Sequence, residues 1–215
     1  MRTSQLPSAA HAPRRPMPPS ELGAKVAFAP SPEVWDWVQR NILAVDGPLY
    51  NPDHHHLADA DVCVLWADGG FTSKMRTVIG TAEEVAFRCN AWQRGRQEQQ
   101  MLQWFGRIPG FLITLDGRYT QECSDAAWAA LVEHELYHLA HKCDPFGAPM
   151  FTRDGKPKIA IQGHDVEEFV GVVRRYGVGD ADSSVARMVK AANSAPEVSK
   201  AALSGACGTC LLKVA

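Results

Sequence analysis

The sequence has little that would take the chain to a membrane or to nucleic acid. Its 215 residues carry 22 Lys and Arg against 24 Asp and Glu, a net charge of −2, so no general charge attraction to either partner is expected. No apolar run approaches the ~20 residues that a membrane-spanning helix needs. Residues 1–20 lack the apolar segment of a secretory signal peptide. We therefore expect a cytoplasmic protein with no membrane partner and no nucleic-acid partner.

Cysteine is also sparse. Six cysteines are scattered over the chain, which predicts reduced thiols and no disulfide framework. Cys207-Gly-Thr-Cys210 has half the spacing of a zinc ribbon, and no second CxxC is present. Two ligands cannot close a structural zinc site. The alternatives for this pair are a tail with two free thiols, a site that another cysteine completes, or a redox pair.

Prolines and apolar periods divide the chain into three predicted parts. Residues 1–20 hold five of the 14 prolines and no apolar period, which predicts a disordered arm. Residues 21–178 are predicted to form one domain, and residues 179–215 a helical extension that ends in the CxxC tail. The elements predicted within these parts are helices over 32–44, 125–142 and 163–176, a helix capped by residues 182–184 that runs to 192, and strands over 61–66, 76–80 and 111–115. A long loop is predicted over 144–163, with room for a short hairpin around Asp154-Gly155. The first two strands are expected to pair, and residues 82–106 are ambiguous.

The candidate metal-binding and catalytic residues are concentrated in the helix predicted over residues 125–142. It contains His134-Glu135-x-x-His138, in which two histidines four residues apart lie on one helix face. Two imidazoles at this spacing can bind one Zn²⁺. Glu135 beside them can act as a general base toward the water that the metal activates. An exposed edge of the preceding strand, 111–115, can hold an extended peptide by strand addition.

A catalytic zinc site usually has a third protein ligand. His164 is the first choice, because it is the only histidine after His141 and follows a glycine at a predicted helix start. Glu167 and Glu168 are the alternatives. His141 lies too close along the helix to His138 for good metal geometry. The triplet His54-His55-His56 is expected to serve packing or hydrogen bonding, because neighbouring side chains in an extended segment point to opposite faces.

The pattern predicts metal-assisted hydrolysis of a peptide bond. Glu135 takes a proton from the attacking water and later delivers it to the leaving amine. An oxyanion stabiliser is also expected, and the candidates are Tyr119, Arg174, Arg175 and Tyr176.

Short segments outside the motif match a known pattern. They are Asn51-Pro52, His56-Leu57-Ala58-Asp59-Ala60, Val64-Leu65-Trp66, Leu115-Asp116, and His164-Asp165-Val166-Glu167-Glu168-Phe169 with Arg175-Tyr176-Gly177. Together with residues 134–138, they make the chain similar to the phage metallopeptidases over roughly residues 25–178. The segment from His164 also resembles the Gly-His-x-x-x-Phe third-ligand segment of SprT-like proteases, which favours His164. The resemblance implies a zincin-like fold and a zinc peptidase of phage or prophage origin, acting on proteins or peptides in the bacterial host.

These observations favour a single α+β, zincin-like domain, with a small mixed or antiparallel sheet packed on the helix that carries the motif. The predicted function is a zinc-dependent peptidase, with Glu135 as the general base. The predicted ligands are His134, His138 and His164. One alternative is a non-catalytic zinc-binding or regulatory phage protein, against which Glu135 argues. Another is a DNA-associated protease of the SprT type, which only the lone CxxC supports.

Overall fold

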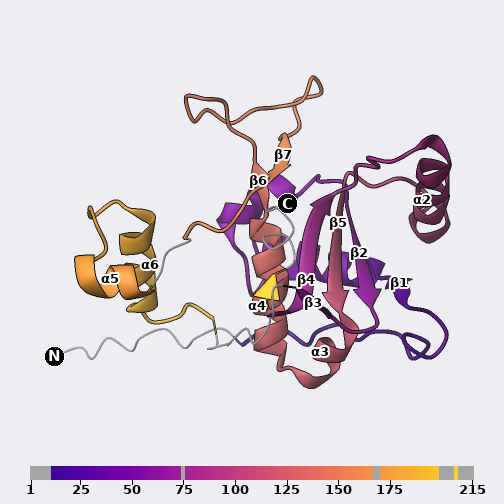
Figure 1. Ribbon diagram of the computed structural model, residues 1–215, viewed down its shortest axis with the longest axis horizontal. Coiled ribbons are helices and arrows are strands. Elements are labelled where there is room, and N and C mark those ends of the chain that lie inside the picture. The colour runs from indigo at the N-terminus through magenta and orange to yellow at the C-terminus, as the bar shows by residue number, and fades with distance from the viewer. Residues whose placement is uncertain (1–10, 74–75, 167–169, 199–205, 208–215) are drawn as a thin grey trace.

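The computed structural model describes residues 11–73, 76–166, 170–198 and 206–207. The fold is α+β, with a mixed sheet that has helices on both faces and a separate two-stranded hairpin (Figure 1). The predicted class and the mixed sheet are therefore confirmed.

The central sheet contains parallel and antiparallel pairs. Five strands follow the order β1-β2-β5-β4-β3, and β8 also pairs with β4. β2 and β5 run parallel, as do β4 and β8, whereas the other neighbours are antiparallel. The bounds are β1 Phe28–Pro30, β2 Val62–Ala67, β3 Phe71–Ser73, β4 Arg76–Glu84, β5 Phe111–Asp116 and β8 Ala206–Cys207.

Two features of the sheet differ from the prediction. The strand predicted over 76–80 does not pair with the strand over 61–66, because β5 lies between β4 and β2. β5 is therefore an interior strand and has no exposed edge for a peptide. Both differences concern pairing between segments far apart in the sequence, which the local pattern does not specify.

β2 is buried on both faces, because alternate side chains of a strand point to opposite sides of the sheet. Val62, Val64 and Trp66 belong to the main core, whereas Cys63 and Leu65 belong to a smaller cluster. The continuous apolar run that predicts this strand is typical of a strand covered on both sides.

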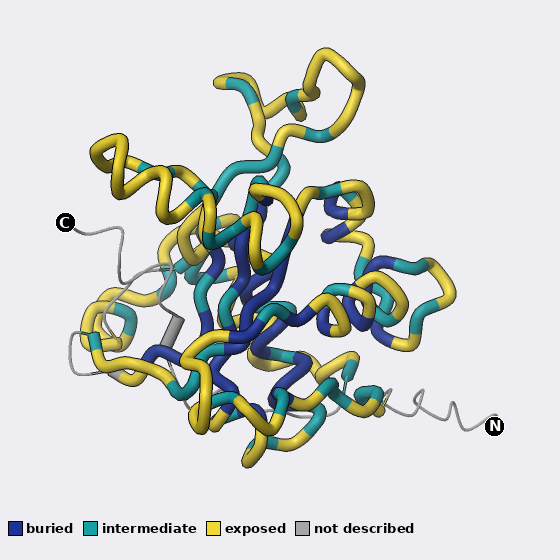
Figure 2. Tube along the Cα trace, turned by 90° about the vertical axis from the view of Figure 1, so that its right-hand side faces the viewer, coloured by how far each residue is buried: buried dark blue, intermediate teal, exposed yellow. Residues whose placement is uncertain are grey.

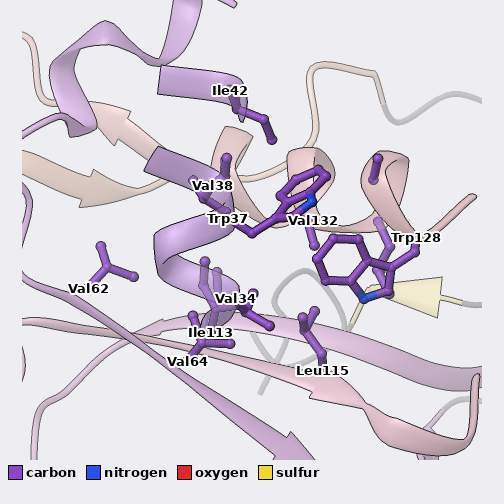
Figure 3. Packing of buried hydrophobic residues seen from close by; sticks show 14 of the residues in the cluster. Val34, Trp37, Val38, Ile42, Val62, Val64, Ile113, Leu115, Trp128 and Val132 are labelled. Atoms are coloured by element: carbon purple, nitrogen blue, oxygen red, sulfur yellow. The ribbon is translucent and has the colours of Figure 1, made fainter. Parts of the chain in front are cut away.

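The main core lies between the sheet and two helices, α1 (Pro32–Val38) and α4 (Asp125–Tyr137) (Figure 3). Trp37 of α1 and Trp128 of α4 meet edge to face, with ring centroids 4.8 Å apart. A π-helical turn, Gln39–Leu43, continues α1 to a cap at Ala44. This confirms the helix predicted over 32–44.

The smaller cluster packs against α2 (Ala91–Phe105), which lies on the other side of the sheet. Its Trp104 and Phe105 contact the cluster, and Asn90 forms a capping box with Gln93 at its first turn. The ambiguous segment 82–106 is therefore the end of a strand followed by a helix.

The segment after α4 forms a two-stranded hairpin, where a long loop with a short hairpin around Asp154-Gly155 is predicted. α4 ends at Tyr137, short of the predicted residue 142, and β6 (Leu139–His141) follows at once. It pairs with β7 (Ile159–Ile161), and the hairpin projects from the fold with an exposed tip (Figures 1 and 2).

Three further helices lie outside the core. α3 (Gly117–Glu122) joins β5 to α4, and α5 (Val170–Tyr176) and α6 (Ser184–Ala192) form a small group beside α4 (Figure 1). Among the described helices, none combines the length and the apolar character needed to cross a bilayer.

The N-terminal segment contacts the fold through Ala12, Arg14 and Arg15. Arg15 pairs with Asp125 at the start of α4, with 2.7 Å between Nη1 and Oδ1, and its Nε donates to the carbonyl of Thr120. The carbonyl of Arg14 accepts from the indole of Trp37. These contacts differ from the disordered arm predicted for residues 1–20, of which residues 1–10 lie outside the described residues.

The contact between Trp37 and Trp128 generates a stability prediction. Trp128 is 0% exposed, so replacing it with alanine should lower the free energy of unfolding by about 3–5 kcal/mol. Trp92, which is 88% exposed in α2, is the matched control, and Trp92→Ala should change stability by less than about 0.5 kcal/mol. Urea denaturation measures both, and equal losses would contradict the assigned core.

Candidate metal centre

α4 carries the first two histidines of the candidate site. Ser124 caps the helix by accepting a hydrogen bond from the N–H of Ala127, as the sequence predicts. His134 lies in the last turn, and His138 is the residue that caps the C-terminus, still with helical backbone angles. The i,i+4 spacing therefore keeps both imidazoles on one face, although the helix ends between them.

Gln162 joins the end of α4 to the segment that carries His164. Its backbone N–H donates to the carbonyl of His138 at 2.9 Å, and its side chain donates to the carbonyl of Tyr137 at 2.8 Å. Its own carbonyl lies 2.8 Å from Nδ1 of His138. These bonds place the chain that follows β7 beside the two helix histidines, and His164 comes two residues later.

The three histidines converge. The Nε2 atoms of His134 and His164 lie 3.2 Å apart, and one ligand atom from each of His134, His138 and His164 lies within 4.8 Å of the others. Ligands at ~2.1 Å around a tetrahedral zinc are about 3.4 Å apart, so the spacing suits one ion. The three histidines form a candidate metal site.

The bond at His138 also fits metal binding. A carbonyl oxygen can only accept, so Nδ1 of His138 carries the proton in its contact with Gln162. Nε2 is then left as the atom with a lone pair, which a metal ligand requires. The donor set is therefore three imidazoles, with the tautomer of one fixed by the protein.

The site is open on one side. His138 is 2% exposed, His134 is half-buried and His164 is exposed. A cavity of about 420 Å³ adjoins them, and Tyr137, Gln162 and Met188 of α6 also line it. The arrangement therefore leaves room beside the histidines for a small ligand or part of a larger one.

Glu135 is not among the described residues that line this cavity, and its carboxylate lies in the contact between α4 and the sheet. It is 0% exposed. A Cβ atom on Gly80 of β4 would lie 2.5 Å from its Oε1 and 3.0 Å from a methyl of Leu131. Glycine at position 80 thus allows the carboxylate to lie directly against the backbone of β4.

A group of polar side chains supports α4 from the side of the histidine triplet. Asn51 Nδ2 donates to Glu133 Oε1 at 2.6 Å and lies 3.0 Å from the hydroxyl of Tyr137, which donates to Asp53. Nε2 of the buried His54 lies 3.7 Å from Oε1 of Glu133. Burial alone raises the pKa of Glu133, but His54 and the bond from Asn51 outweigh it and hold the pKa below its usual value.

His54 and His56 of the triplet serve packing and hydrogen bonding, as the sequence predicts, whereas His55 is exposed. The triplet lies in a 3-10 helix, Pro52–Leu57, and not in the extended segment predicted for it. His56 Nε2 donates to the carbonyl of Leu139 at 2.6 Å, and burial lowers the pKa of its imidazole. His141 stacks on His56, with ring centroids 5.8 Å apart, and bonds the carbonyl of Met150. Neither His56 nor His141 belongs to the three-histidine cluster.

Other predicted candidates remain outside the cluster. Glu167, Glu168 and Cys210 lie outside the described residues, so the alternative third ligands stay predictions. The four oxyanion candidates, Tyr119, Arg174, Arg175 and Tyr176, are not among the described residues that line the cavity at the histidines.

A family model described as "Putative phage metallopeptidase" matches residues 35–193. The chain belongs to this family. The match confirms the predicted resemblance and extends past residue 178, where the resemblance is predicted to end, to include α6. No curated protein and no solved structure matches the chain. Membership of the metallopeptidase family therefore rests on sequence, and the zincin-like fold remains a prediction.

Three residues that support the site, Gly80, Gln162 and Asn51, are not identified by the sequence analysis. Gly80 lies in a predicted strand and Gln162 in a predicted loop, and nothing local distinguishes either residue. Asn51 stands within a segment of family resemblance, but its contact with Glu133 spans 82 residues. Only pairing between distant segments could have revealed these roles.

The approach of Gly80 to Glu135 generates a second prediction. Gly80→Ala places a methyl against a buried carboxylate, so it should lower the free energy of unfolding by about 1–3 kcal/mol. Gly95 within α2 is the matched control, because a Cβ there meets nothing within 4 Å. Gly95→Ala should stabilise by about 0.5–1 kcal/mol through helix propensity. Denaturant unfolding tests the pair, and a neutral Gly80→Ala would argue against the contact.

Proposed function

We propose that this chain is a zinc-dependent peptidase with a zincin-like site, in which His134, His138 and His164 bind the metal and Glu135 is the general base. The observation that carries the proposal is the convergence of three imidazoles within 4.8 Å, next in sequence to a fully buried carboxylate. Membership of the metallopeptidase family supports protein or peptide substrates.

The chemistry divides between the metal and the chain. A bound zinc ion would act as a Lewis acid that polarises the scissile carbonyl and lowers the pKa of a water. His138 would hold the ion through Nε2, because Nδ1 donates to the carbonyl of Gln162. Glu135 accepts a proton from the water that attacks the carbonyl carbon, and the C–N bond then breaks as the same proton passes to the leaving nitrogen.

The position of Glu135 favours this function over a purely structural metal site. A structural zinc site is closed by four protein ligands, whereas the cluster of described residues has three, beside a cavity of about 420 Å³. A carboxylate next in sequence to a histidine of an open site is suited to proton transfer, for which a purely structural site has no use.

Metal content is the first test. The purified chain should bind about one zinc, and His138→Ala or His164→Ala should weaken binding by more than about 100-fold, because even outer partners of a metal ligand contribute 10–100-fold. His55, exposed between two packed histidines, supplies the control, and His55→Ala should keep the zinc. Competition with a chromophoric chelator measures the affinities. A folded wild-type protein without affinity for zinc would exclude the site.

Cleavage is the second test. Glu135→Gln should keep the zinc and lower the rate of fluorescein-casein cleavage by about 10²–10⁴-fold, the usual contribution of a general base. Glu122→Gln changes an exposed carboxylate at the end of α3 and should have no effect. If Glu135→Gln cleaves casein as fast as the wild type, Glu135 has no part in the reaction. If a contaminating protease is responsible for the casein cleavage, preparations of His138→Ala and His164→Ala will cleave casein as fast as the wild type.

A further inference from the structure

The outer edge of β4 is occupied by the C-terminal strand β8. A residue in a sheet has two sides on which it can pair. Val78 pairs with Phe71 of β3 and with Ala206 of β8, and Gly80 pairs with Leu115 of β5 and with Cys207 of β8. β3 and β5 therefore share one side of β4, and β8 lies along the other side.

This edge adjoins the proposed general base. Gly80 is at once the pairing partner of Cys207 and the residue whose Cα lies against the carboxylate of Glu135. Paired strands are ~4.8 Å apart, so the backbone of β8 runs within about one strand spacing of the strand that Glu135 contacts. A peptide added to this edge would take the same place.

The surroundings suit an extended peptide. A cavity of about 600 Å³ is lined by β4 residues from Val78 to Glu84, by residues of β1, β2, β3 and β5, and by Ile161 of β7. Ile161 belongs to the short strand that precedes Gln162 and His164. The cavity thus extends from the sheet around β4 to the strand that precedes the third histidine, and its lining is mostly apolar.

The C-terminal part of the chain approaches the site at two further points. Met188 of α6 lines the cavity at the three histidines, and Val198 packs against the main core. Glu135, meanwhile, is 0% exposed, although a general base has to reach the substrate and its water. Glu135 is therefore covered in the described arrangement, although the cavity beside the histidines is open.

We propose that the outer edge of β4 is the peptide-binding edge of the site and that β8 occupies it from within the same chain, so that substrate must displace β8. This inference rests on the proposed peptidase function. Exposed sheet edges bind extended peptides through main-chain hydrogen bonds. Within the described residues β8 pairs through Ala206 and Cys207, so it competes largely through the high effective concentration that linkage gives it. A longer peptide with more hydrogen bonds can replace it.

The test uses peptide binding in full-length protein, with Glu135→Gln present to prevent cleavage. Ala206→Pro with Cys207→Pro removes both backbone N–H donors of β8. The probe is a fluorescein-labelled peptide with the sequence of residues 203–210 and serine in place of both cysteines. If β8 fills the edge about nine-tenths of the time, the proline variant should bind this peptide about tenfold more tightly than the parent.

A matched control keeps the N–H groups. Ala206→Gly with Cys207→Ala should bind the peptide as weakly as the parent, which separates loss of pairing from loss of the thiol. Fluorescence anisotropy gives the affinities, and a scrambled peptide checks their specificity. Affinities that agree within twofold for the parent and the proline variant would overturn the proposal.

A second variant keeps the proposal testable if the proline variant does not fold. Val78→Cys with Ala206→Cys joins two register partners by a disulfide, and Cys207→Ala removes the neighbouring thiol. The oxidised form should bind the peptide at least tenfold more weakly than the form reduced with a phosphine, and equal binding would refute the role of β8. Failure of casein cleavage would count against the peptidase function, whereas these binding results do not depend on catalysis.

Discussion

The candidate metal centre depends on the hydrogen bonds between Gln162 and the end of α4. The last carbonyls of a helix have no partner within the helix, and Gln162 satisfies those of Tyr137 and His138. Its carbonyl also accepts from the ring of His138. One residue thus ends the helix, orients one imidazole and delivers His164 to the other two.

The two halves of the site have different physical surroundings. The histidines lie at the end of a helix and on an exposed segment, next to an open cavity. Glu135 lies in the packed layer between α4 and β4, among core side chains. The positions of the three candidate ligands therefore depend on the end of α4 and on the exposed segment after β7. The position of Glu135 depends on packing in the core. The fold can hold Glu135 in place before any ion is bound.

The parts of the site that could be predicted from sequence are those that local interactions determine. The cap at Ser124, the i,i+4 histidines and the buried strand over 111–115 are each visible within a few residues. His164 could be predicted as a ligand because it is the one histidine after His141 in the sequence. The interior position of β5, the early end of α4 and the approach of Gly80 to Glu135 were not. Each depends on which distant segment pairs with or packs against it.

The π-helical turn at Gln39–Leu43 links α1 to α4, the helix that carries His134. Its wider winding leaves the carbonyls of Asn41 and Ile42 to accept from the N–H groups of Leu49 and Asn51. Asn51 in turn bonds Glu133, the residue before His134. The connection is tightly packed, because a Cβ atom at Gly47 would lie 2.6 Å from the carbonyl oxygen of Asn41. An insertion or deletion between residues 39 and 51 would therefore shift Asn51 and its contact beside His134. The length of this connection is constrained as well as its composition.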